Sequence, residues 1–115
     1  MQHSNIILAL TLLLVPLVTI SANNSEPRAT GLWEPIKNAT DPHVVEIANF
    51  AINEYNLVTY SKLKFEKVLE AKQQHILGVN YWEKIQALDG TVSGQYVTIV
   101  HEIGKIKRLV SFIKI

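Results

Sequence analysis

The sequence predicts an α+β protein, in which a single long helix packs on an antiparallel sheet of four to five strands. Three observations predict this class. A single segment, which begins near Pro42, carries apolar residues at helical spacing. The chain after Leu57 alternates polar and apolar residues and is rich in β-branched and aromatic types. Glycine-containing turns separate the alternating segments, so we expect hairpins with a core between the helix and one face of the sheet.

The N-terminal residues have the pattern of a secretory signal. Residues 6–20 form an apolar run without charge, followed by the small residues Ser21 and Ala22. The run is shorter than the ~20 residues that span a bilayer. We expect a signal peptide over 1–22, a flexible polar segment over 23–30 and a folded domain over 31–115. The protein would then be secreted, or held in the endomembrane lumen; a retained membrane anchor is the alternative, because residues 1–5 lack Lys and Arg.

Composition excludes several classes of function. Eleven Lys and Arg nearly balance ten Asp and Glu in the 115 residues, which argues against a protein built to hold nucleic acid or an anionic membrane. The chain has no cysteine, so disulfides and thiolate chemistry are excluded. Its four His residues lack metal-ligand spacing, and no nucleophile, phosphate-loop or dinucleotide motif is present. We therefore expect no metal, no cofactor and no enzymatic activity. Asn23 and Asn38 begin acceptor triplets for N-glycosylation.

The first part of the domain predicts an edge strand and then the helix. Residues 32–36 form a short extended segment, placed at an edge because Pro35 cannot donate to a central ladder. Asp41 is expected to cap the helix, with Pro42 at its first position and Asn56 at its end. The expected buried stripe consists of Val44, Ile47, Ala48, Ala51 and Tyr55.

The remaining strands are expected near 60–72, 77–88, 95–102 and 106–114. Asp89-Gly90 and Ser93-Gly94 mark one boundary, and Gly104 marks another. In the strand from residue 77, apolar residues occupy one face and Glu83 is the exception. Between the first two of these strands lies a short uncharged turn, residues 74–78, with the sequence Gln-His-Ile-Leu-Gly. Exposed turns are normally polar, so this apolar tip indicates either a surface that a partner covers or a turn packed on its own protein.

Three motifs in order resemble those of plant cystatins (phytocystatins), which are protein inhibitors of papain-like cysteine proteases. The helix segment 47–56, Ile-Ala-Asn-Phe-Ala-Ile-Asn-Glu-Tyr-Asn, resembles the family's helix signature, with Asn49 where a charged residue is usual. Gln74-x-Ile76-x-Gly78 resembles the family's Gln-x-Val-x-Gly loop. Gly31 and the residues after it resemble the N-terminal trunk and first strand. The resemblance covers residues 31–115 and implies a cystatin-like fold.

The resemblance also implies a mechanism and its contact residues. Inhibition would be reversible and competitive, with the trunk and first hairpin inserted into the active-site cleft of a papain-like protease. Gly31 and Gly78, which lack Cβ atoms, would let the backbone approach the enzyme wall closely. The implied contacts in the trunk and first hairpin are Gly31, Leu32, Gln74, His75, Ile76, Leu77 and Gly78. Those in the second hairpin are His101, Glu102 and Ile103.

The second hairpin departs from the family pattern. The family has Pro-Trp at this tip, whereas this chain has Glu102-Ile103. Without the aromatic anchor we expect weaker inhibition or a narrower target range. We expect a monomer that binds no nucleic acid and, after signal cleavage, no membrane; a dimer that swaps strands at the first hairpin is the alternative. A non-inhibitory secreted protein with this fold, serving binding or storage, is the alternative function. His75 would either make affinity pH-dependent or face solvent without a role.

Overall fold

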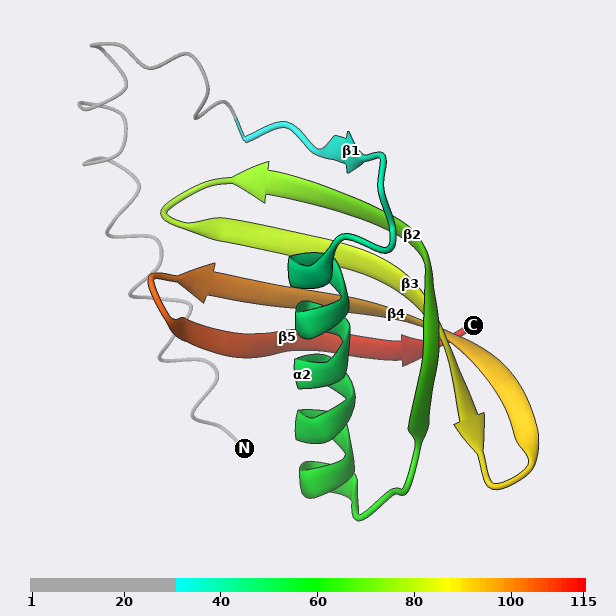
Figure 1. Ribbon diagram of the computed structural model, residues 1–115. Coiled ribbons are helices and arrows are strands. Elements are labelled where there is room, and N and C mark those ends of the chain that lie inside the picture. The colour runs from blue at the N-terminus through cyan, green and yellow to red at the C-terminus, as the bar shows by residue number, and fades with distance from the viewer. Residues whose placement is uncertain (1–30) are drawn as a thin grey trace, which may run out of the picture. The chain divides into compact units, whose positions relative to one another are not determined.

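The structure is a computed structural model that describes residues 31–115, which form one compact unit. Its elements are β1 (Glu34–Ile36), α2 (Pro42–Thr59), β2 (Lys64–His75), β3 (Val79–Asp89), β4 (Val92–Ile103) and β5 (Ile106–Lys114). The five strands form one antiparallel sheet in the order β1-β2-β3-β4-β5, curved around α2 (Figure 1). The predicted α+β class is confirmed. The expected signal peptide, the segment 23–30 and Asn23 lie outside the described residues.

The helix begins where its capping signal predicts and ends later than predicted. The Asp41 carboxylate accepts a hydrogen bond from the His43 backbone N–H at 2.9 Å, and Pro42 occupies the first turn. At the other end the left-handed residue is Tyr60, with φ 61°, so Asn56 is not the terminator. The Asn56 side chain instead bridges to the backbone N–H and C=O of Leu63, each at 3.0 Å. Its amide therefore anchors the loop after α2 and leaves the helix free to continue to Thr59.

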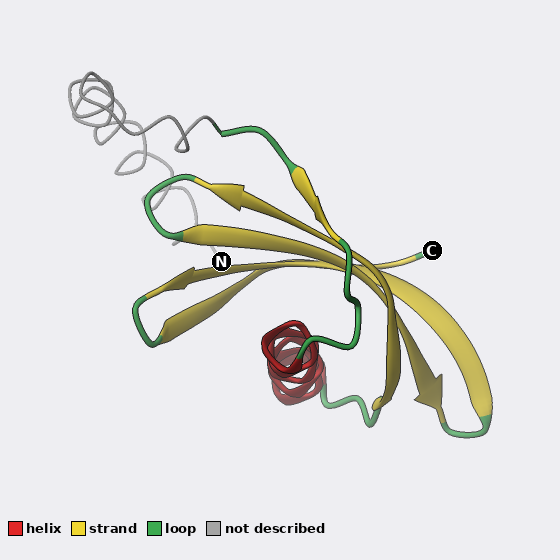
Figure 2. Cartoon of the chain, turned by 45° about the horizontal axis from the view of Figure 1, so that its top comes forward, coloured by secondary structure: helices red, strands yellow, loops and turns green. Residues whose placement is uncertain are grey.

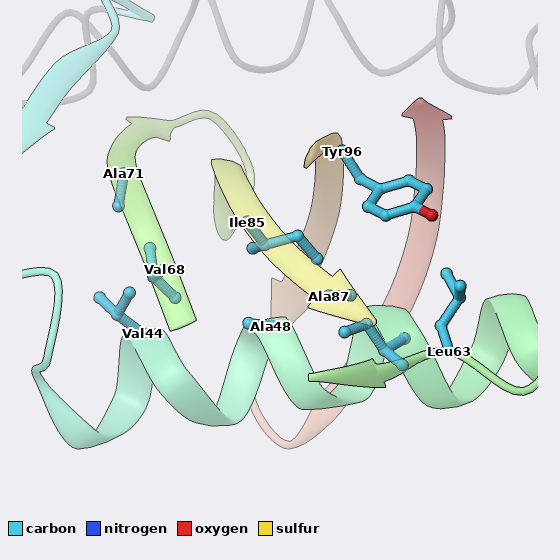
Figure 3. Packing of buried hydrophobic residues seen from close by; sticks show 9 residues of the cluster. Val44, Ala48, Leu63, Val68, Ala71, Ile85, Ala87 and Tyr96 are labelled. Carbon is cyan, nitrogen blue, oxygen red and sulfur yellow. The ribbon is translucent and has the colours of Figure 1, made fainter. Parts of the chain in front are cut away.

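The core lies between α2 and the concave face of the sheet, as predicted. Figure 3 shows Val44 and Ala48 of the helix facing Val68, Ala71 and Ile85 of the sheet. The ring of Tyr55 stacks on Phe112 of β5 with centroids 4.0 Å apart, which closes the core at the far edge. No helix among residues 31–115 combines the length and hydropathy needed to cross a membrane.

Strand boundaries follow the predicted segments with two corrections. Residues 60–63 are a connection, and β2 begins at Lys64. Ser93-Gly94 lies inside β4, so its prediction as a boundary was wrong; the chain reverses at Gly90, whose φ is +70°. Gly90 supplies the left-handed conformation that this turn requires, so Ser93 and Gly94 can pair within the strand.

Glu83, the exception in the alternating pattern, is a fully buried carboxyl in the core. It lies on β3 opposite Thr98 of β4, and both side chains have 0 % exposure. Neither the two carboxyl oxygens of Glu83 nor the Thr98 hydroxyl has a hydrogen-bond partner within the described structure. Burial raises the pKa of Glu83 from 4.5 to about 8. The group is therefore mostly protonated, and so mostly neutral, in the folded protein at pH 7.

Candidate functional site

Two hairpin turns and the N-terminal segment of the described chain meet at one end of the sheet. The turns that follow β2 and β4 lie side by side in both views (Figures 1 and 2), and the register pairs Val79 with Glu102 between them. The segment before β1 joins them because Glu34 pairs with Gln73 of β2. We call this surface the tip edge and define it as Gly31–Leu32, His75–Gly78 and Ile103–Ile106. Most of the predicted contact residues lie on it.

The tip edge exposes apolar side chains from all three segments. The exposed fractions are Leu32 69 %, Ile76 40 %, Leu77 47 %, Ile103 52 % and Ile106 75 %. Apolar side chains gathered at one end of a small domain are typical of a surface that a partner covers. No group of three metal-ligating side chains occurs among the described residues.

The first turn holds Leu77 in a left-handed conformation. The Ile76 N–H donates to the Gly78 carbonyl at 3.1 Å, and between them Leu77 has φ 48°. A residue with a Cβ pays roughly 1–2 kcal/mol for this region, which Gly, Asn and Asp occupy more readily. The chain therefore keeps a strained, exposed leucine at a position where a polar turn residue would be more stable.

Gln74 braces the trunk against the first hairpin. Its Nε2 donates to the Gly31 carbonyl at 2.8 Å, and its Oε1 accepts from Asn80 Nδ2 at 2.9 Å. A Cβ on Gly31 would lie 3.3 Å from the Ile76 side chain, so the trunk also packs closely on the tip. The Gln74 amide thus acts inside the domain, whereas sequence reasoning assigned it to a partner.

Gly78 is required by contact between the two hairpins. A Cβ at this position would lie 2.5 Å from the Glu102 carbonyl oxygen and 2.5 Å from Ile103 Cγ1, and φ is +98°. Real side chains do not tolerate such contacts, so any other residue would push the second hairpin away or distort the first turn. The predicted reason for this glycine was close approach to an enzyme; the structure adds an internal reason that acts before any partner binds.

The second turn presents an isoleucine pair where the family pattern has Pro-Trp. Gly104 and Lys105 form the two-residue turn, and Gly104 has φ 61°, as hairpins with glycine in the first turn position require. Ile103 and Ile106 are therefore opposite one another in the ladder. Sequence reasoning named Ile103 and missed Ile106. Treating Gly104-Lys105 as a two-residue turn would have placed both on the tip.

The two histidines on the predicted contact surface differ in their environments. His101 Nε2 donates to the Leu77 carbonyl at 2.8 Å and so ties the second hairpin to the strained residue of the first. His75 pairs with Val79 at the end of the first hairpin and is half-buried. His101 therefore supports the tip from inside the domain. The sequence indicated only a contact with a partner for this residue, not this internal hydrogen bond.

Glu102 points toward the helix and away from the tip. Its Oε1 lies 2.7 Å from His43 Nε2 and its Oε2 lies 3.7 Å from Lys107 Nζ, and the side chain is only 13 % exposed. The fold has therefore already desolvated and paired this charge within the domain. His43 and Lys107 are further residues that sequence reasoning missed, since 59 positions separate His43 from Glu102.

Comparison with known proteins places the chain among plant proteinase inhibitors. A family model described as "Aspartic acid proteinase inhibitor" matches residues 36–115. "Cysteine proteinase inhibitor 5" of Arabidopsis thaliana is 42 % identical over 110 residues, which cover 93 % of this chain and 86 % of the relative. "Cysteine proteinase inhibitor 6" of Oryza sativa subsp. japonica is 37 % identical, over 93 % of this chain and 96 % of its own. "Cystatin-1" of Zea mays is 36 % identical over 70 % of this chain and 60 % of the relative.

These relatives are inhibitors by name, which supports the expectation that the chain is not an enzyme. The fold, the order of the three motifs and the extent of these matches agree with one another. The chain belongs to the plant cystatin family of proteinase inhibitors.

Proposed function

We propose that this chain is a reversible, competitive inhibitor of papain-like cysteine proteases, whose active-site cleft receives the tip edge. The names of the relatives support cysteine proteinases as the target class. We further propose that the protein acts after secretion, as a monomer, once residues 1–22 have been removed.

The observation that carries this proposal is the conformation of Leu77. Its left-handed backbone costs stability, and its side chain is 47 % exposed, so it gains little from packing within the domain. Strain that persists in spite of its cost is concentrated at sites of function. Burying this leucine in a protease cleft would recover the apolar contact that the free protein lacks.

The braces behind the tip edge explain how it would bind without large entropic loss. Gln74 fixes the trunk, and His101 fixes the first turn against the second hairpin. A tip that is ordered before binding does not lose its conformational freedom on binding. The same turn keeps the backbone around Leu77 out of the extended form that a protease needs in order to cleave, so no covalent step is required.

The test is inhibition of papain by the purified protein and by Leu77→Asn. Asparagine tolerates the left-handed region, so this variant should fold at least as stably while losing the apolar contact. We expect its inhibition constant to rise ~10- to 100-fold, the loss expected for a buried leucine at an interface. The matched control is Leu57→Asn, the same change at an exposed leucine on α2.

Two results would contradict the proposal. If Leu77→Asn inhibits as tightly as the native protein, the first hairpin is not the contact. If the folded native protein does not inhibit papain at all, the alternative of a non-inhibitory binding or storage protein takes its place.

A second candidate function is inhibition of an aspartic proteinase, which the description of the matching family model favours. The same preparations are tested against a pepsin-type enzyme at acidic pH. Inhibition of that enzyme alone would replace the cysteine-protease proposal. If Leu77→Asn then left pepsin inhibition intact, the contact would lie on a surface other than the first hairpin.

A further inference from the structure

A cluster of charged side chains joins the second hairpin to the start of α2. His43 Nε2 lies 2.7 Å from Glu102 Oε1, and His43 Nδ1 lies 3.1 Å from Glu46 Oε1. Lys107 completes the cluster, with its Nζ 3.1 Å from Glu46 Oε2 and 3.7 Å from Glu102 Oε2. Glu102 and Lys107 are opposite one another in the ladder, and each is one position from the tip pair Ile103 and Ile106 on the same hairpin. The cluster therefore reaches the base of the second tip.

The geometry requires a doubly protonated imidazole. A neutral histidine carries one N–H, and its other nitrogen is an acceptor. Here both ring nitrogens face carboxylate oxygens, which only accept, at 2.7 and 3.1 Å. Both contacts are favourable only when His43 is an imidazolium. The hydrogen bond to Glu102 is the largest cause that raises the pKa of His43 above 6.5, in agreement with this geometry.

The groups around His43 determine what deprotonation would do. Glu46 faces the ring from α2, Tyr81 from β3 and Glu102 from β4. Lys107 of β5 contacts both glutamates, and the Asp41 carboxylate, which precedes α2, accepts a hydrogen bond from the His43 backbone N–H. The Glu46 side chain is 55 % exposed and can turn to solvent, but that of Glu102 is 13 % exposed. Loss of the proton thus leaves Glu102 with a weaker, neutral hydrogen bond to His43 and with Lys107 at 3.7 Å.

We propose that His43 is a positioning residue: when its imidazole carries two protons it holds the second hairpin on α2, and deprotonation loosens the Ile103–Ile106 tip. The effect on hairpin order is independent of the proposed function; only the effect on protease binding rests on it. Because Gly78 packs on the Glu102 carbonyl and on Ile103, loosening of the second hairpin also removes support from the first turn. The tip edge would therefore be most ordered at acidic pH.

The direction with pH follows from the raised pKa. The interaction is fully present below the unfolded value of 6.5 and is lost as pH rises through the higher folded value. The second hairpin should lose order across that interval, and protease affinity should weaken with it.

The experiment measures order in the second hairpin without any protease. Amide hydrogen exchange of residues 101–108 is followed in the purified protein across the His43 titration, and each rate is divided by its intrinsic rate at that pH. Protection is then expressed relative to that of the core strand β3, so that the pH dependence of global stability caused by Glu83 cancels. We expect protection in the native protein to fall ~3- to 10-fold as pH rises, the loss expected when a charge-assisted hydrogen bond becomes neutral. His43→Ala should show the lower protection at every pH. His43→Gln, which can donate to Glu102 but cannot titrate, should show intermediate protection without a pH response.

Controls separate His43 from other histidines and from folding. His75→Gln should retain the pH response of residues 101–108, because that ring is not part of the cluster. Glu102→Gln, which keeps the length and shape of the side chain but removes its charge, should lose the pH response even if His43→Ala folds poorly. Papain inhibition is then measured on the same variants, and Asn49→Ala, an exposed change on the same helix, should leave it unaffected.

The two readouts distinguish the failure of this inference from the failure of the proposed function. A pH response that survives in His43→Gln, or protection in His43→Ala equal to the native value, overturns the role of His43. A native protein that does not inhibit papain but shows the expected exchange behaviour overturns only the proposed function.

Discussion

The buried carboxyl of Glu83 makes stability depend steeply on pH. Its side chain is fully buried without a hydrogen-bond partner, and burial raises its pKa from 4.5 to about 8. An acid with a raised pKa favours the folded state below its unfolded pKa, and this advantage is lost as pH rises through the folded value. The contribution of Glu83 to stability should therefore be greatest at and below pH 4.5 and fall until about pH 8.

The size of the effect follows from the same two values. Each pH unit in which the unfolded carboxyl is ionised and the folded one is not costs about 1.4 kcal/mol. Over the interval from 4.5 to about 8 the free energy of unfolding should fall by about 5 kcal/mol, a large part of the ~5–15 kcal/mol that a small domain has. The perturbation is Glu83→Gln, which keeps the shape of the side chain and cannot ionise, so it should remove most of the slope.

The assay is urea unfolding, monitored by circular dichroism, from about pH 4.5 to pH 8, compared between the native protein and Glu83→Gln. His43, whose pKa is also raised, makes the free energy of unfolding fall with pH in the same direction. The variant His43→Gln is therefore measured beside Glu83→Gln as a control. Equal slopes in the native protein and Glu83→Gln would show that Glu83 does not titrate between these two pKa values on unfolding. So would a native free energy of unfolding that is flat across this range.

Two other substitutions test the supports of the tip edge. Gly78→Ala would place a Cβ 2.5 Å from the Glu102 carbonyl oxygen at φ +98°. It should lower the free energy of unfolding by about 1–3 kcal/mol and weaken papain inhibition; a variant as stable as the native protein would show that the hairpins separate easily. Asp41→Ala removes the hydrogen bond to the His43 N–H and should lower the free energy of unfolding by about 1 kcal/mol in urea titrations. An unchanged midpoint would show that Pro42 alone fixes the start of α2.

Features with local causes could be predicted from the sequence. The start of α2 was predictable because Asp41-Pro42 acts within a single turn of chain. The hairpin at Gly104 and the alternating strands were predictable for the same reason, since turn chemistry and period-two burial are local. The predicted end of α2 was wrong because the Asn56 side chain bonds to Leu63, a loop residue seven positions away.

Features of the site that depend on tertiary contact could not be predicted. Nothing in the sequence brings His43 to Glu102 before the sheet curves around the helix. The internal need for Gly78 arises from the neighbouring hairpin, and the strain at Leu77 arises from how the turn closes. Sequence reasoning therefore found the residues on the tip edge more readily than the residues that hold it in place.

Leu77 is held in a strained, exposed conformation, and we propose that a cysteine protease buries it. The most direct measurement is the inhibition constant for papain of the native protein, Leu77→Asn and Leu57→Asn, determined at several substrate concentrations. We expect competitive inhibition that weakens ~10- to 100-fold in Leu77→Asn and is unchanged in Leu57→Asn. Equal inhibition by all three proteins, or none by the native protein, would contradict it.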